Sequence, residues 1–325
     1  MMNGVLRWPI TLTRVARNVL FNLLDPPVLV LTYHRVTRLQ SDPQMLAVTP
    51  EHFRAQLQLL KKRFSLVRFE DDWPHRKKPA VAITFDDGYA DNVLEALPVL
   101  EAEETPAAFF VSTGIIGTDQ EFWWDELERI LLGRRTFPER FELEDGPFGR
   151  SWPTGTAAER HVLYKDLLLL MKKVEAARRG LWLMQLRHWA AAGEEGREIN
   201  RAMTIDELRL LARSKWATVG AHTVTHTPLS SISGAEQRKE IEESKERLES
   251  WVDRKIAVFS YPFGQRGDYT QETVDLCRKA GFTKAAANFP GQAHRWTDPY
   301  QIPRLVVRNW PAEVFMKQLK RFWIV

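Results

Sequence analysis

The sequence is poor in cysteine and contains no long uninterrupted hydrophobic run. Its 325 residues include one cysteine, Cys277, which excludes a disulfide framework, and the helical pattern around it indicates a buried structural thiol rather than a nucleophile. No stretch approaches the roughly 20 apolar residues that span a membrane. Low-complexity tracts and internal repeats are also absent. With 44% hydrophobic residues, the chain can instead bury a full core as one large α/β domain.

The chain also lacks a strong excess of one charge. It carries 46 basic and 42 acidic residues, a net charge of +4, and the two signs are interspersed. This distribution argues against a nucleic-acid partner. Residues 1–24 lack the apolar core and cleavage site of a secretory signal, so we expect an N-terminal helical extension there and a cytoplasmic protein. Residues 10–24 form either a basic amphipathic helix lying on a membrane or a helix packed on the domain.

Short apolar runs recur along the chain and mostly alternate with stretches of helical spacing. The expected strands lie near Val28, Ser65, Ala80, Ala107, Ala217, Ile256, Thr283 and Ile302. This alternation predicts an α/β fold, a distorted TIM-like (β/α) barrel of about seven to eight strands, over residues 25–325. The rhythm breaks at about residues 115–201, where we expect a helical insertion. Its aromatic run, residues 122–124, is typical either of buried anchoring or of stacking on sugar rings.

Polar residues able to bind a metal follow some of these runs. Asp86 and Asp87 end one run, and adjacent carboxylates repel each other unless a cation or a proton-transfer task offsets the repulsion. His222 and His226 follow another run at a spacing that lets both rings face one ion. Taken singly, these motifs also fit a solvated turn and an accidental histidine pair. Because the carboxyl ends of parallel strands converge on one face, we expect the four side chains to meet.

Residues 84–88, Thr-Phe-Asp-Asp-Gly, and residues 222–226, His-Thr-Val-Thr-His, resemble the first two motifs of the polysaccharide deacetylase family. This family is also called the NodB-homology domain or carbohydrate esterase family 4. The resemblance extends over about residues 27–307 and implies a distorted barrel that holds one divalent metal, usually zinc. By resemblance, Asp87 and the two histidines are the metal ligands, and Asp86 is the general base for a metal-activated water.

Other positions depart from the family pattern. Backbone N–H groups of the turn at Phe263 and Gly264 are the expected oxyanion donors. Ser260 stands where the family has an arginine that orients the base, and Arg304 is either its replacement or part of a surface ion pair. The late histidine motif is also missing. His34, at the end of the first expected strand, is the expected acid for the leaving amine, with a structural histidine as the alternative.

The sequence therefore predicts a metal-dependent hydrolase that removes N-acetyl or O-acetyl groups from a glycan or a glycan precursor. A hydrolase of the same fold that acts on an amide of a non-sugar substrate is the alternative enzyme. A catalytically silent glycan-binding protein is the third hypothesis. The missing arginine and late motifs favour this hypothesis, whereas the four intact metal and base positions oppose it, because an unused buried acid pair is costly to keep.

Overall fold

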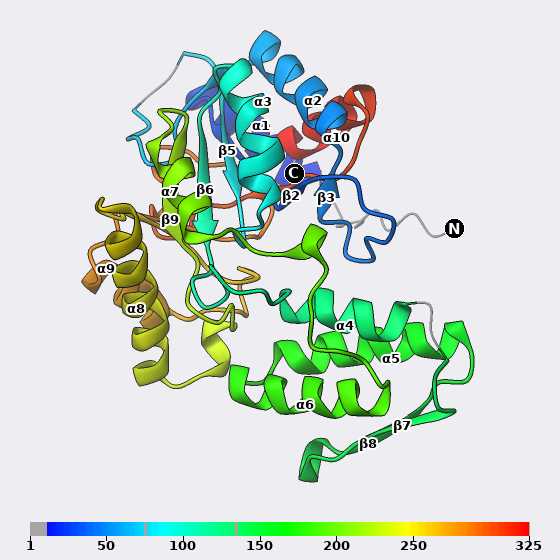
Figure 1. Cartoon of the computed structure of the whole chain (residues 1–325). Coiled ribbons are helices and arrows are strands. Elements are labelled where there is room, and N and C mark those ends of the chain that lie inside the picture. The colour runs from blue at the N-terminus through cyan, green and yellow to red at the C-terminus, as the bar shows by residue number, and fades with distance from the viewer. Residues whose placement is uncertain (1–11, 75–76, 134–135, 325) are drawn as a thin grey trace.

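The computed structural model describes residues 12–74, 77–133 and 136–324 (Figure 1). Its centre is a parallel sheet whose main strands are hydrogen-bonded in chain order. These strands are β1 (Val28–Tyr33), β5 (Ala80–Phe85), β6 (Ala107–Val111), β9 (Ala217–Ala221), β10 (Val258–Ser260), β11 (Lys284–Ala286) and β12 (Leu305–Val306). β12 pairs with β1, and a bridge between Ala286 and Ile302 joins β11 to the chain before β12. The edges of the sheet therefore meet in the predicted distorted (β/α) barrel.

The remaining strands are short. β4 (Ser65–Leu66) pairs with the first two residues of β5, and β6 pairs with β5 from Ile83 onward, so β4 and β6 share one edge of β5. Each run from which the sequence predicts a barrel strand is therefore present in this sheet. β2 (Arg35–Val36) and β3 (Ala47–Val48) form a separate parallel pair.

Helices surround the barrel (Figure 1). They are α1 (Leu12–Leu24), α2 (Pro50–Arg63), α3 (Leu97–Ala102), α7 (Ile205–Arg213), α8 (Gly234–Val252), α9 (Gln271–Lys279) and α10 (Ala312–Ile324). Short helical turns lie at Asn92–Ala96, Gly146–Phe148, Glu198–Asn200 and Leu229–Ser231. α7 and α8 begin at capping boxes, in which the Thr204 and Ser233 side chains accept a backbone N–H three residues later. Cys277 is fully buried in α9, as expected for a structural thiol.

The barrel strands bury side chains on both faces. One apolar cluster, which includes Val30, Ala82 and Phe110, takes alternate residues from neighbouring strands and fills the barrel interior. The residues between them pack outward against the helices. In this outer layer Phe85 stacks on Phe109 and Tyr33, with ring centroids 4.7 and 5.4 Å apart. Burial on both faces explains why these strands are continuous apolar runs in the sequence.

The helical insertion lies between β6 and β9 and forms a separate lobe below the barrel in Figure 1. It contains α4 (Trp123–Leu132), α5 (Ala157–Lys172) and α6 (Ala176–Trp189), which share an apolar cluster of their own. It also contains an antiparallel hairpin, β7 (Arg140–Leu143) and β8 (Arg150–Pro153), which the sequence analysis did not predict. Each hairpin strand has four residues, too few for a period of two to stand out among helical patterns.

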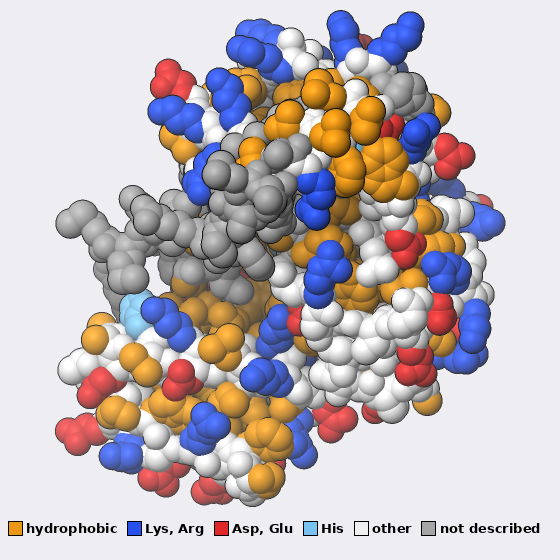
Figure 2. Space-filling view, turned by 180° about the vertical axis from the view of Figure 1, so that it is seen from behind, with side chains coloured by type: hydrophobic (Ala, Val, Ile, Leu, Met, Phe, Trp, Pro, Cys, Tyr) orange, Lys and Arg blue, Asp and Glu red, His pale blue; other side chains and the backbone are white. Residues whose placement is uncertain are grey.

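The expected N-terminal extension is described only in part. Residues 1–11 lie outside the described residues, and α1, which follows them, packs against α10. Among the described residues, no helix is both long and apolar enough to cross a bilayer. Lys and Arg side chains are interspersed with acidic and apolar ones over the face seen in Figure 2. That mixture agrees with the charge pattern of the sequence.

Candidate functional site

The inward-facing rows of the barrel strands lead to the predicted site residues. Ala82 of β5 belongs to the interior cluster, and Asp86 continues the same row because strand side chains alternate with a period of two. Val30 of β1 leads to His34 in the same way. The strand sequence therefore determines that both side chains lie at the carboxyl end of the barrel.

Along β9 the same alternation leads from Gly220 to His222. Only glycine fits at position 220. A Cβ there would lie 2.6 Å from the ring of Phe110, which fills the interior. The close approach of β9 to this ring positions the His222 backbone, whose N–H donates to the carbonyl of Val111 at 3.1 Å.

The structure brings Asp87, His222 and His226 together. One potential ligand atom from each residue lies within 4.8 Å of the other two. Nε2 of His226 is 3.3 Å from Oδ1 of Asp87, and Nε2 of His222 is 3.7 Å from the same oxygen. All three side chains are buried. Two imidazole nitrogens and one carboxylate oxygen are a donor set that suits a divalent metal and leaves a coordination position for water.

Left-handed backbone conformations mark this region. Asp87 has a φ of 77°, His226 of 53° and Phe263 of 59°, values that are unfavourable for residues with a Cβ. Each costs on the order of 1–3 kcal/mol, and such strain concentrates at functional sites. The surrounding fold therefore offsets the free-energy cost of these three backbone conformations, which set the directions of the side chains.

Both histidines of the cluster are neutral. Burial lowers the pKa of His222 to about 4. Burial, with a smaller contribution from the Arg179 charge, lowers the pKa of His226 to about 3. The His222 Nδ1–H donates to the carbonyl of Ser260 at 2.7 Å, which leaves the lone pair on Nε2, the nitrogen facing Asp87. This neutral tautomer is the form of histidine that binds a metal.

The carboxylate of Asp87 needs a cation. Burial raises its pKa, and the electrostatic interactions with His34 and His222 offset this only in part. In the described part of the chain, no donor forms a hydrogen bond with its oxygens, and the two imidazole nitrogens lie 3.3 and 3.7 Å from Oδ1. A divalent ion at this point would compensate the buried charge, so the residues present fit the metal that the motifs imply.

Asp86 is held by an arginine. Its two oxygens accept hydrogen bonds from Nη1 and Nη2 of Arg304, both at 2.7 Å. Burial would raise the pKa of Asp86, but the ion pair outweighs burial and lowers the pKa to about 2. Arg304 is 1% exposed, so this pair is not a surface ion pair. Its Nη2 also donates to Oγ of Ser260, the residue at the position of the family arginine.

His34 lines the same cleft as the carboxylates. Burial lowers its pKa, while the charges of Asp87 and Asp86 act in the opposite direction. Its Nδ1 is buried and has no hydrogen-bond partner among the residues that the structure describes, and the contact with the neighbouring loop is made by its backbone carbonyl, which accepts from Asn92 at 2.8 Å. The ring is therefore not used to brace this loop.

The turn after β10 differs from the expectation in one respect. The Gly264 N–H donates to the carbonyl of Pro262 at 2.6 Å, so it is not free to bind an oxyanion. Gly264 is needed for close packing, because a Cβ there would lie 2.8 Å from the Asn288 nitrogen. Phe263 lines the cleft, and its ring centroid is 4.8 Å from that of His226. The Phe263 N–H is therefore the remaining candidate donor in this turn.

Comparison with known proteins agrees with this geometry. The model of the polysaccharide deacetylase family matches residues 74–133 and 187–285, which contain both motifs and skip most of the insertion lobe. The chain belongs to the polysaccharide deacetylase family. It is therefore a hydrolase of the class that cleaves carbon–nitrogen bonds in carbohydrates.

Individual relatives are distant. YxkH of Bacillus subtilis (strain 168), provisionally named a polysaccharide deacetylase, is 22% identical over 287 residues, which are 86% of this chain and 70% of YxkH. The Streptococcus pyogenes deacetylase PplD, solved in complex with acetate, has a TM-score of 0.57 at 15% identity, over 90% of this chain and 98% of PplD. IcaB from Ammonifex degensii has a TM-score of 0.56 at 18% identity, over 92% of this chain and 97% of IcaB. These structures share the barrel fold.

In this family member the cleft has a volume of about 260 Å³. The residues that line it are His34, Gln44, Leu46, Asp86, Asp87, Trp124, Lys172, His222, His226, Phe263, Gln265, Asn288, Val306 and Arg308. The insertion supplies two of them, Trp124 from α4 and Lys172 from α5. Sequence reasoning missed Lys172 and Arg308. Arg308 lies two residues beyond the end of β12, so the convergence of strand ends is a signal for it, whereas nothing in the sequence indicates Lys172.

Trp124 fits the buried-anchor interpretation of the aromatic run and also lines the cleft. It is 4% exposed, as an anchor should be, and its ring centroid is 4.7 Å from that of His226. Its Nε1–H donates to the Tyr89 hydroxyl at 2.7 Å, which in turn donates to Asp125 at 2.6 Å. The guanidinium of Arg35 lies 4.2 Å from the Tyr89 ring centroid. This chain of contacts ties the insertion to the loop that follows the Asp86–Asp87 motif.

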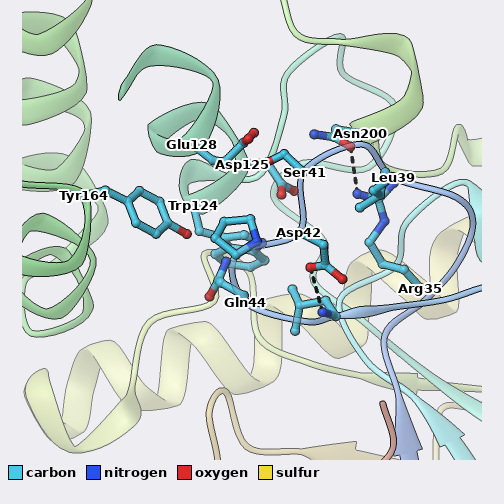
Figure 3. A pocket seen from close by; sticks show the side chains of 12 residues that line it. Arg35, Leu39, Ser41, Asp42, Gln44, Trp124, Asp125, Glu128, Tyr164 and Asn200 are labelled. Carbon is cyan, nitrogen blue, oxygen red and sulfur yellow. Dashed lines mark hydrogen bonds between the residues drawn. The ribbon is translucent and has the colours of Figure 1, made fainter. Parts of the chain in front are cut away.

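A small polar pocket (Figure 3) lies next to the cleft and shares Gln44, Leu46 and Trp124 with it. Its volume is about 10 Å³, roughly that needed for one water molecule. Arg35 donates to Asn200 at 2.8 Å, and Asp42 accepts the Leu46 N–H at 2.9 Å. These contacts give the small pocket next to Trp124 a largely polar, hydrogen-bonded lining.

Proposed function

We propose that this protein is a metal-dependent deacetylase that hydrolyses N-acetyl, or O-acetyl, groups of a glycan or a glycan precursor. The observation that supports this most directly is the buried cluster of Asp87, His222 and His226 beside an ionised Asp86 in one cleft. Family membership supplies the substrate class.

The metal ligands in this proposal are Asp87, His222 and His226, and we propose zinc as the ion. When bound, a divalent ion supplies a Lewis acid that activates a water molecule and polarises the acyl oxygen. The remaining steps are assigned to side chains and backbone groups of the cleft. The carbonyl of Ser260 keeps the lone pair of His222 directed at the cluster throughout.

Asp86 accepts the proton of the attacking water as the oxygen bonds to the acyl carbon. Its pKa of about 2 keeps it ionised at physiological pH, and Arg304 fixes its orientation. The Phe263 N–H stabilises the negative charge that develops on the acyl oxygen. His34 gives a proton to the leaving nitrogen as the carbon–nitrogen bond breaks, and the products are acetate and a free amine.

Asp86→Asn tests this assignment. We expect the variant to keep its bound metal while acetate release from N-acetylhexosamine oligomers falls by roughly 10² or more, as for loss of a general base. Asp275→Asn, at a half-exposed carboxylate on α9, is the matched control and should change neither quantity. If the wild type binds metal but releases nothing from any acylated substrate, it is a glycan-binding protein. Release only from non-sugar amides would favour the alternative enzyme.

We also keep a cytoplasmic location as a proposal, with α1 either packed on the domain or in contact with a membrane. The exposed leucines of α1, Leu20 at 54% and Leu23 at 77%, favour the membrane contact. Flotation of the full chain with anionic lipid vesicles would separate the two, because a helix packed only on the domain leaves the protein in the unbound fraction.

A further inference from the structure

Two cationic side chains line the cleft without a part in the proposed chemistry. Arg308 follows β12, and Lys172 is the last residue of α5 in the insertion. Both lie around the same 260 Å³ cleft as Asp86 and the metal-binding cluster. They therefore approach any substrate from two different parts of the fold.

Among the described residues, Arg308 forms no ion pair, although the charge of Asp42 acts on it from a longer distance. It is half-buried, yet in the described part of the chain no carboxylate lies within ion-pair distance of it. Its Nη1 donates to the carbonyls of Gln44 and Met45, at 3.0 and 2.5 Å. A partly desolvated guanidinium is unfavourable without a compensating anion. Asp86, which lines the same cleft, cannot serve, because Arg304 already pairs with both of its oxygens.

Lys172 is held beside Phe263. Its ammonium forms an ion pair with Asp268 at 2.8 Å and lies 4.3 Å from the ring centroid of Phe263. These contacts fix the cation beside the turn that borders the metal-binding cluster. Arg308 therefore supplies a cation whose burial the Asp42 charge offsets only in part, and Lys172 supplies a second cation that is fixed in position.

We propose that the cleft selects an acylated sugar that carries an oxyanion, a carboxylate or a phosphate, which binds to the free edge of Arg308 with support from Lys172. This inference rests on the proposed function and adds the charge of its substrate. A guanidinium binds carboxylate and phosphate through paired hydrogen bonds, whereas an ammonium acts as a point charge. The two sources of the anion share this chemistry, and substrates carrying one or the other distinguish them.

The measurement is the ratio of kcat/KM for an anionic substrate to kcat/KM for its neutral parent. The substrates are an N-acetylhexosamine dimer and two derivatives, one with a carboxylate and one with a phosphate. We expect the wild-type ratio to exceed about 10 for at least one derivative and to fall as salt is added. Whichever derivative is preferred identifies the source of the anion.

Substitutions identify the residues that are responsible for the preference for an anionic substrate. Arg308→Gln should lower the ratio by about 10- to 100-fold, as for loss of a charge-assisted hydrogen bond, and Arg308→Lys should lower it less. Lys172→Met should lower it by a few-fold. Arg266→Gln is the matched control, because Arg266 is an exposed arginine stacked on Phe289 outside the cleft. It should leave the ratio unchanged.

The two proposals fail in different ways. If no acylated sugar is hydrolysed, the proposed function is wrong. If neutral and anionic substrates are hydrolysed equally well by the wild type, or if Arg308→Gln keeps the wild-type ratio, only the inference about charge is wrong. Should Arg308→Gln fail to fold, because it loses the contacts with Gln44 and Met45, Lys172→Met decides. A lower ratio then supports anion selection, and an unchanged ratio overturns it.

Discussion

Arg304→Met would leave Asp86 as an unpaired carboxylate inside the barrel. The two side chains are 1% and 4% exposed, and the pair includes two hydrogen bonds of 2.7 Å. Breaking a buried pair by removing one partner costs about 3–5 kcal/mol, because the remaining charge stays desolvated. Methionine is apolar and flexible enough to occupy the vacated volume, so little of the loss would come from a cavity.

The pH dependence of this loss has a defined sign. In the wild type the Asp86 pKa of about 2 lies below the unfolded value of about 3.9, so the pair stabilises the fold above pH 4 and ceases to as the pH falls toward 2. Without Arg304, burial raises the Asp86 pKa above the unfolded value. The variant therefore loses stability as the pH rises above 4, and its difference from the wild type is largest near neutral pH.

Urea unfolding of the metal-free proteins at pH 3 and pH 7 measures both effects. We expect a difference in unfolding free energy of about 3–5 kcal/mol at pH 7 that shrinks markedly at pH 3. Asp86→Asn in the same background should recover part of the loss, because it removes the charge that lacks a partner. A difference that is equal at both pH values would refute the reasoning, since the loss would then come from packing and not from the Asp86 charge.

Two further predictions concern the histidines. In the metal-free protein the pKa values of His222 and His226, about 4 and about 3, lie below the unfolded value of about 6.5, so stability should fall as the pH drops below 6.5. The slope of the unfolding free energy against pH should approach about 3 kcal/mol per pH unit, with about 1.4 kcal/mol from each imidazole. His226→Asn should halve this slope. A flat profile of the unfolding free energy between pH 7 and 5 would show that the rings are not buried and neutral. His34→Gln should lower acetate release by roughly 10² or more with metal content and unfolding midpoint unchanged, and loss of folding would instead assign His34 a structural role.

The barrel was predictable because its strands are buried on both faces. Parallel strands packed between an interior and a helical layer need apolar residues along their whole length, and such runs are visible without an alignment. The site follows from the same strands. Two-residue periodicity leads from Ala82 to Asp86 and from Val30 to His34. The same alternation along β12 places Arg304 and Arg308 on the inward-facing row. It was not used to predict either residue from the sequence.

The insertion was predictable only in outline. Its helices have the expected spacing, but the hairpin Arg140–Pro153 is short and is stabilised by packing within the lobe. The contribution of Lys172 to the cleft depends on how α5 is placed relative to β10, a long-range contact that no local pattern encodes. Trp124 shows the same limit, since its burial and its contact with His226 both depend on the docking of the lobe.

Ser260 and Arg304 compensate each other. All five N–H donors of Arg304 have acceptors: the Ala287 carbonyl at 2.8 Å, Thr84 Oγ1 at 3.2 Å, both Asp86 oxygens and Ser260 Oγ at 2.8 Å. A guanidinium inside a barrel is tolerable only when its donors are satisfied in this way. Ser260 therefore supports Arg304 directly. Its short side chain leaves room for the guanidinium, and its hydroxyl accepts the fifth hydrogen bond. A second arginine at position 260 would place two like charges beside one carboxylate, so Ser260→Arg should be tolerated only together with Arg304→Ser.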